Sequence, residues 1–115
     1  MNIEEFYAEI SGNYQEALSR MMRESLVERF ALKFAKDKSF EDLETNLRAG
    51  NTELAFYGAH TLKGVCKNLA FTKLADSASE ITELLRAGKL EAAQEYFPVV
   101  KADYDIVIEA LGKLS

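Results

Sequence analysis

Apolar side chains recur along most of the chain at the three- and four-residue spacing of amphipathic helices. No strand-like alternation of apolar and polar residues is long enough to predict a sheet. Because the connections are only a few residues long, neighbouring helices should run antiparallel. The pattern predicts an all-α fold, an antiparallel up-and-down four-helix bundle with a short additional N-terminal helix. The predicted helical segments cover residues 3–10, 14–37, 39–49, 52–68, 72–87 and 90–112.

Local signals refine the helix boundaries. A break near residues 23–25 is expected inside the second segment. Ser39, followed by Asp42 in the same first turn, predicts a capping box at the start of the third. Pro98 removes a helical hydrogen bond and clashes with the preceding turn, so a kink or short break is expected in the last helix. The large apolar residues of the second segment are assigned to the core: Leu18, Met21, Met22, Leu26, Val27, Phe30 and Phe34.

The composition is that of a globular protein, and its 115 residues suit a single domain over 1–115 with the bundle core at about 14–112. The net charge of −5 argues against nucleic acid as the main partner. No apolar run approaches the roughly 20 residues of a membrane span, and the N-terminus does not resemble a signal peptide. A single cysteine cannot form an internal disulfide. We therefore expect a cytoplasmic protein without nucleic-acid or membrane partners, and we expect it to act as a monomer.

The stretch 56–69 contains the only histidine of the chain, and as a helix it divides into two faces. One face is apolar and predicted to be buried: Ala55, Ala59, Leu62, Cys66 and Leu69. His60 points away from that face, toward water or a partner. Four residues one or two turns away share its side and form with it what we call the exposed strip: Phe56, Lys63, Gly64 and Lys67.

The exposed strip has the groups that a covalent transfer needs. A solvated imidazole keeps a nucleophilic neutral form at neutral pH and can form covalent intermediates. Lys63 supplies a positive charge suited to a phosphoryl oxygen. Gly64 costs a helix about 0.5–1 kcal/mol relative to alanine, and it leaves room for an approaching partner. Phe56 is a large apolar group on the same face, which suits docking.

An ordinary helix surface explains the same residues without chemistry. A lone exposed histidine is most often a solvated side chain, Lys63 and Lys67 fit a solvated face, and Gly64 fits close helix packing. Other sites are not predicted, since the chain has no glycine-rich phosphate loop and no kinase motif. His60 and Cys66 lie on opposite faces, so they cannot share a metal ion or act as base and nucleophile.

The sequence His60-Thr61-Leu62-Lys63-Gly64, followed by Asn68-Leu69, resembles the signature of histidine phosphotransfer (HPt) domains. Residues 49–51 and 85–93 also resemble the family, and the similarity covers about residues 20–112. These domains are four-helix bundles that shuttle phosphoryl groups between the aspartates of receiver domains. The exposed strip is therefore read as a phosphotransfer site.

Two positions depart from the family pattern. Lys67 and Ala70 stand where many members have small residues, often glycine. Lys67 adds a positive charge one turn past Lys63, which bears on the choice of partner. Alanine resists the left-handed conformation that glycine adopts freely, so a turn of another shape is expected at Ala70.

The resemblance implies a phosphorelay intermediate. His60 would accept a phosphoryl group from a receiver phosphoaspartate, through its outer ring nitrogen, and pass it to another receiver. Lys63 would stabilise the phosphoryl oxygens, Gly64 would give access, and Phe56 and Lys67 would contact the partner. That partner would be a response-regulator receiver domain or a hybrid histidine kinase. The chain would hold no metal of its own, Mg²⁺ would belong to the receiver, and no autonomous kinase activity is expected.

Other interpretations stay open. The chain could be a helical module that binds receivers or signalling proteins without carrying phosphate. It could also be a histidine-kinase dimerisation domain, which would need two long dimerising helices and normally a following ATP-binding domain. The sequence leaves open whether the chain is a whole protein or a domain excised from a larger hybrid kinase.

Overall fold

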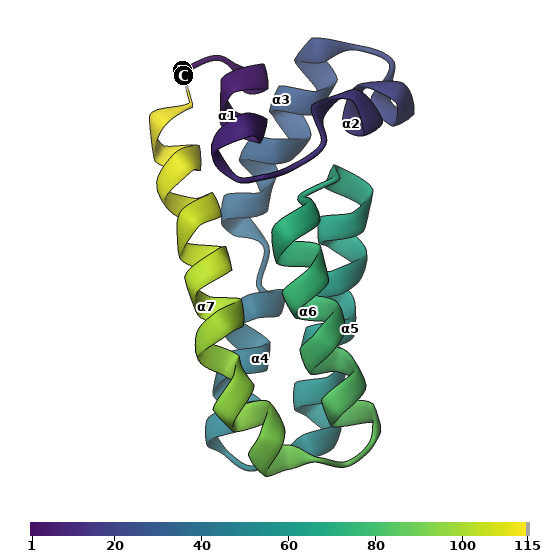
Figure 1. The fold of residues 1–115 in the computed structure, drawn as a ribbon, viewed down its shortest axis with the longest axis vertical. Helices are drawn as coiled ribbons and strands as arrows, with labels where there is room; N and C mark the ends of the chain where they lie inside the picture. The colour runs from purple at the N-terminus through teal and green to yellow at the C-terminus, as the bar shows by residue number, and fades with distance from the viewer. Residues whose placement is uncertain (115) are drawn as a thin grey trace.

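The computed structural model describes residues 1–114. Within this range the chain folds into seven α-helices and one short 3-10 helix, with no strand (Figure 1), so the all-α prediction is confirmed. None of these helices is both long and apolar enough to cross a bilayer. In chain order the elements are α1 (Ile3–Glu9), α2 (Tyr14–Met21), α3 (Glu24–Lys33), η1 (Phe34–Lys36), α4 (Ser39–Arg48), α5 (Thr52–Leu69), α6 (Thr72–Arg86) and α7 (Leu90–Lys113).

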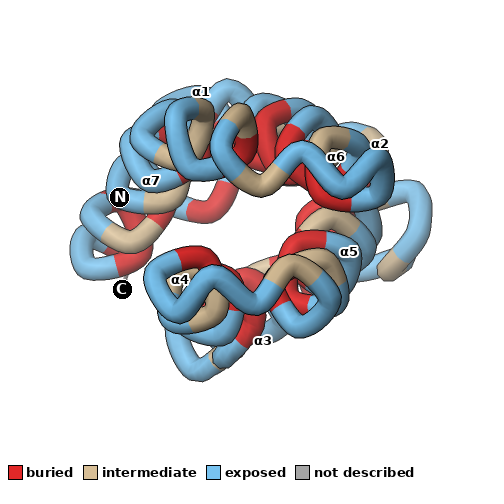
Figure 2. Tube along the Cα trace, turned by 90° about the horizontal axis from the view of Figure 1, so that it is seen from below, coloured by how far each residue is buried: buried red, intermediate tan, exposed pale blue. Residues whose placement is uncertain are grey.

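Helices α4, α5, α6 and α7 lie side by side along the longest axis of the molecule (Figure 1). α5 packs against both α4 and α6, α6 packs against α7, and α7 contacts α4. Seen along that axis, buried positions face inward and exposed positions face outward (Figure 2). Short connections at residues 49–51, 70–71 and 87–89 join the four helices. This packing is compatible with the predicted helical bundle.

The short N-terminal helix is confirmed, and it covers one end of the bundle (Figure 1). Phe6 and Tyr7 on α1 each lie 5.7 Å, between ring centroids, from Phe71. Phe34 contacts the same ring at 5.3 Å. All four side chains are buried. This aromatic cluster joins the N-terminal segment to the connection between α5 and α6.

The predicted break in the second segment is also confirmed, and it changes which side chains are buried. α2 ends at Met21 and α3 begins at Glu24, because Met22 turns the chain with a left-handed φ of 71°. The turn leaves Met22 80% exposed, and Phe30 on α3 is 40% exposed. The assignment of these two side chains to the core is therefore wrong. The chain forms two separate helices here, so one helical register does not run through the whole segment.

α4 begins differently from the predicted capping box. The Asp37 carboxylate accepts a hydrogen bond from the Ser39 backbone N–H at 2.9 Å and another from the Ser39 hydroxyl. The N-cap position is Lys38, whose side chain makes no capping bond. The capping-box prediction is wrong because Asp37, one residue before the N-cap, bonds a donor at the start of the helix instead.

α7 continues through Pro98 without interruption. The expected short break is therefore not found, whereas the kink at this proline stays a prediction. Pro98 lies on the exposed side of the helix. Water can therefore bond the carbonyl that the missing N–H leaves without a helical partner.

α4 approaches α5 closely at a glycine. Gly58 is buried, and a Cβ atom placed on it would lie 2.8 Å from the backbone nitrogen of Leu43 and 3.1 Å from its Cα. A side chain does not fit at these distances from a helix backbone, so only glycine allows the approach. The contact fixes α4 against the first half of α5.

Gly58→Ala is expected to lower the free energy of unfolding by about 1–3 kcal/mol, because the added methyl group forces α4 away from α5. Urea unfolding followed by circular dichroism measures this change. Alanine has the higher intrinsic helix propensity. A variant at least as stable as wild type would therefore mean that the two helices can separate without loss of packing.

Candidate functional site

Local bonds at the N-terminal end of α5 set where the histidine helix begins. The Asn51 side chain accepts a hydrogen bond from the Leu54 N–H at 3.0 Å and so caps the helix. Gly50, with a φ of 72°, follows the end of α4 and turns the chain directly into that cap.

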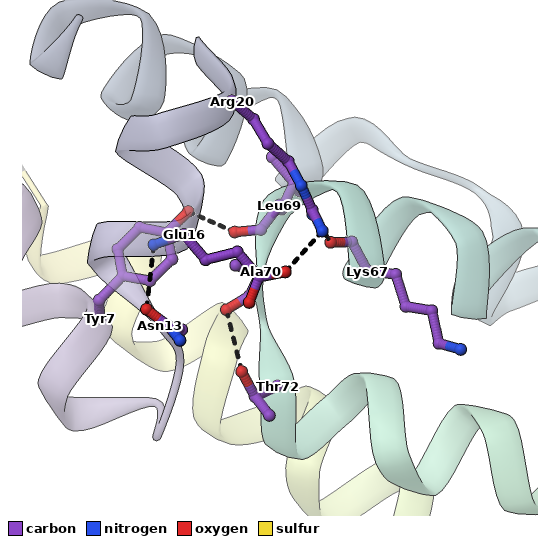
Figure 3. A network of polar contacts seen from close by, with 8 residues as sticks. All are labelled: Tyr7, Asn13, Glu16, Arg20, Lys67, Leu69, Ala70 and Thr72. Carbon is purple, nitrogen blue, oxygen red and sulfur yellow. Dashed lines mark hydrogen bonds and ion pairs between the residues drawn. The ribbon is translucent and has the colours of Figure 1, made fainter. Parts of the chain in front are cut away.

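The C-terminal end of α5 turns at Ala70, which is left-handed with φ 57° and ψ 37°. The expectation of another turn shape is wrong, although the left-handed conformation costs alanine about 1–2 kcal/mol. Hydrogen bonds from segments at the start of the chain offset this cost (Figure 3). The Ala70 carbonyl accepts from the Asn13 N–H at 2.9 Å, and the Tyr7 hydroxyl donates to the Leu69 carbonyl at 2.6 Å.

Arg20 of α2 closes the same end of α5. Its guanidinium donates to the Lys67 carbonyl and pairs with Glu16 at 2.5 Å (Figure 3). This last-turn carbonyl of α5 also accepts a hydrogen bond from the N–H of Ala70, the C-cap residue, at 3.1 Å, so Arg20 is its second donor. The side chain of Lys67 points away from this network and is exposed. Its charge is therefore not used to close the helix end.

The two predicted faces of α5 are confirmed. His60 is exposed, and the opposite face is buried: Ala55, Ala59, Leu62, Cys66 and Leu69. Burial raises the pKa of the Cys66 thiol. The thiol stays protonated and inaccessible at neutral pH, so it is not a competing nucleophile.

The imidazole of His60 stacks on the ring of Phe56, one turn earlier, with centroids 5.7 Å apart and planes 12° apart. The guanidinium of Arg86, the last residue of α6, lies 4.9 Å from the centroid of the same ring. Phe56 is therefore half-buried, not freely exposed as expected. Sequence reasoning missed Arg86, because the periodicity of one helix does not reveal a side chain that approaches from another.

Lys63 and Lys67 carry the positive charge of the exposed strip. Lys63 is half-buried and Lys67 is exposed. Seven ion pairs occur within residues 1–114, and none of them involves either lysine. The strip thus keeps two cations without carboxylate partners in a chain whose net charge is −5. Such charges remain available to an anionic group.

Gly64 is exposed, and a Cβ atom placed on it would meet nothing within 4 Å. Close helix packing therefore explains Gly58 and does not explain Gly64. Gly64 therefore leaves an open surface one turn after His60. This opening costs the helix about 0.5–1 kcal/mol relative to alanine.

Two apolar residues of α5 that sequence reasoning did not single out lie exposed in the turns before His60. Leu54 is 49% exposed and Tyr57 is 55% exposed. The Tyr57 ring contacts the Phe56 ring at 5.7 Å. A helical wheel could have found Tyr57, since it lies three residues before His60. We call Leu54, Phe56 and Tyr57 the α5 apolar surface.

The strip combines an exposed imidazole, two lysines that form no ion pair within residues 1–114, and an open surface at Gly64. Together these groups suit a covalent intermediate with an anionic group. In the part of the chain that the structure describes, no three His, Cys, Asp or Glu residues are grouped so as to hold a metal ion.

Comparison with known protein families gives one match. Residues 16–110 match the family model of the Hpt domain. The match covers most of the chain, including every residue of the exposed strip. No curated protein and no solved structure matches the chain.

Gly64→Ala is expected to raise the free energy of unfolding by about 0.5–1 kcal/mol, because the methyl group meets open space and alanine favours the helix. Parallel urea unfolding of Gly64→Ala and Gly58→Ala gives a matched comparison within one helix. The two changes should have opposite signs. Destabilisation at both positions would contradict the open surface beside His60.

Proposed function

Because the chain belongs to the Hpt domain family, we propose that His60 carries a phosphoryl group between receiver domains. Proteins of this family transfer phosphoryl groups in two-component phosphorelays and interact with receiver domains. One observation carries the assignment to this residue. The only histidine of the chain is exposed on the same helix face as lysines that no carboxylate neutralises within residues 1–114.

In the proposed step the outer ring nitrogen of His60, Nε2, attacks the phosphorus of a receiver phosphoaspartate. The nitrogen lone pair forms the N–P bond, the acyl O–P bond breaks, and its electron pair leaves with the aspartate carboxylate. The proton of the imidazole can pass to solvent, because the ring is exposed. Attack by the aspartate of a second receiver on the phosphohistidine reverses this exchange and delivers the group.

The neighbouring residues have separate proposed roles. Lys63 stabilises the phosphoryl oxygens as negative charge develops and then holds the phosphorylated state. Lys67 assists from one turn further and contacts the partner. Gly64 keeps the approach to the imidazole open. Mg²⁺ belongs to the acidic pocket of the receiver, so the complete site exists only in the complex.

The α5 apolar surface is the proposed docking surface for the receiver. Leu54 and Tyr57 supply its exposed area, and the Phe56 ring contacts that of Tyr57. Exposed apolar area of this kind next to a reactive group is typical of a protein interaction site. The proposed partners are response-regulator receivers, free or within a hybrid histidine kinase. We propose that the protein acts as a cytoplasmic monomer and does not react with ATP alone.

Wild-type protein is expected to acquire acid-labile phosphate from receiver domains that a small-molecule donor has phosphorylated in the presence of Mg²⁺. His60→Gln should acquire none, because glutamine keeps a polar side chain of similar size without the nucleophilic nitrogen. Intact-protein mass spectrometry at neutral pH, compared with acid-treated samples, measures the transfer.

Receiver binding to the same two proteins is the control. If receivers bind both proteins and phosphorylate neither, the chain is an interaction module that carries no phosphate. Phosphate on His60→Gln would contradict the assignment of this residue.

Lys63→Ala is expected to slow transfer about ten- to hundredfold, the effect of losing one charge-assisted hydrogen bond to the phosphoryl group. Rapid-quench kinetics with one phosphorylated receiver measures the rate. Lys67→Ala removes the same charge one turn further away and should slow transfer only about threefold, as expected for a more distant, screened charge. Equal losses in the two variants would show that overall charge matters and that Lys63 has no specific contact.

A further inference from the structure

The stack on Phe56 is the contact through which the structure orients the His60 ring. Within residues 1–114 no side-chain hydrogen bond and no ion pair involves the imidazole. Its ring lies nearly parallel to that of Phe56, 12° from it at a centroid distance of 5.7 Å. No carboxylate or carbonyl among the described residues therefore sets the orientation of the nucleophile.

Orientation matters for the reaction. An exposed histidine on a helix has several staggered χ1 rotamers and a broad χ2. Transfer requires the nitrogen about 3–3.5 Å from the phosphorus and aligned with the bond that breaks. Side chains four residues apart lie above one another on a helix, and parallel rings gain from offset stacking. A ring held beneath His60 thus favours one set of imidazole orientations.

Phe56 is itself held in place. It packs against the hydrophobic core and is half-buried. The Arg86 guanidinium lies 4.9 Å from its ring centroid, a cation–π contact from α6. The Arg86 headgroup in turn contacts its own helix, because its Nε donates to both Glu83 carboxylate oxygens at 3.1 and 3.3 Å. The orientation of Phe56 is therefore set by two helices.

The neighbouring ring provides a contrast. Tyr57 is 55% exposed and meets the edge of Phe56 at 62°. Its aromatic contact is with Phe56 and not with the imidazole. Of these two adjacent rings, one is free to meet a partner and the other contacts the nucleophile.

We infer that Phe56 is a positioning residue that holds the His60 imidazole for transfer, and that Arg86 acts by holding Phe56. The inference rests on the proposed function of His60 and deepens it. It also differs from a docking role for Phe56. Docking changes how tightly the receiver binds, whereas positioning changes how fast the bound complex reacts.

Single-turnover transfer at increasing receiver concentration separates these roles. Phe56→Leu keeps an apolar side chain and removes the ring. It should lower the maximal rate about fivefold and leave the half-saturating receiver concentration within about twofold of wild type. Phe56→Tyr restores the ring and should restore the maximal rate.

The NMR signals of the imidazole give a readout that needs no phosphate. His60 is the only histidine, so its ring protons are identified without ambiguity. Wild type and Phe56→Tyr should show nuclear Overhauser contacts between the two rings and ring-current shifts of the imidazole protons. Phe56→Leu should lose both.

Two further variants are matched controls. Tyr57→Leu removes the adjacent ring and should raise the half-saturating concentration while the maximal rate and the imidazole signals stay unchanged. Arg86→Met should lower the maximal rate in the wild-type background and have no further effect in Phe56→Leu, because it acts through the ring. Additive losses would mean that Arg86 acts independently of Phe56 and would overturn that part of the inference.

The outcomes that contradict the two proposals differ. Phosphorylation of wild type with an unchanged maximal rate in Phe56→Leu, or with only a raised half-saturating concentration, overturns the positioning role alone. Absence of ring contacts in wild type also overturns it. A wild-type protein that no receiver phosphorylates contradicts the proposed function and removes this inference with it.

Discussion

Short side chains on the inner face of α5 let its neighbours approach its backbone, and the placement of the exposed strip follows from that approach. Ala55 and Ala59 are fully buried, and Gly58 admits the backbone of α4 beside Leu43. A rotation of α5 about its axis would push larger residues into these contacts and expose the apolar face. The direction in which His60 points is therefore a consequence of how tightly the opposite side is packed.

Stability and the proposed chemistry belong to opposite sides of this one helix. The inner side consists of buried residues that the fold requires. On the outer side, Gly64 contacts no neighbour and Lys63 and Lys67 make no ion pair within the described chain. Substitutions on the outer side can therefore alter the proposed phosphoryl transfer with little effect on folding. Phe56 is the exception, because it packs against the core and also contacts the imidazole.

Features that depend on local sequence could be predicted, and features that depend on distant segments could not. Helical periodicity was enough to place His60 opposite the buried face, and the Asn51 cap follows from the residues next to it. The left-handed turn at Ala70 could not be foreseen, because bonds from the start of the chain hold that end of α5. Arg86 was not predicted for a similar reason, because its side chain contacts Phe56 from another helix, α6.

The bonds that close the C-terminal end of α5 also bear on where this domain begins. The family match starts at residue 16, whereas Tyr7 and Asn13 lie before that point and bond the last carbonyl of α5 and that of the turn after it. A truncation drawn at the start of the family match would remove both donors and leave Arg20 as the side chain of α2 that still bonds this end of α5. The N-terminal segment therefore clamps the end of the histidine helix. The structural unit that holds this helix begins before residue 16, where the family match starts.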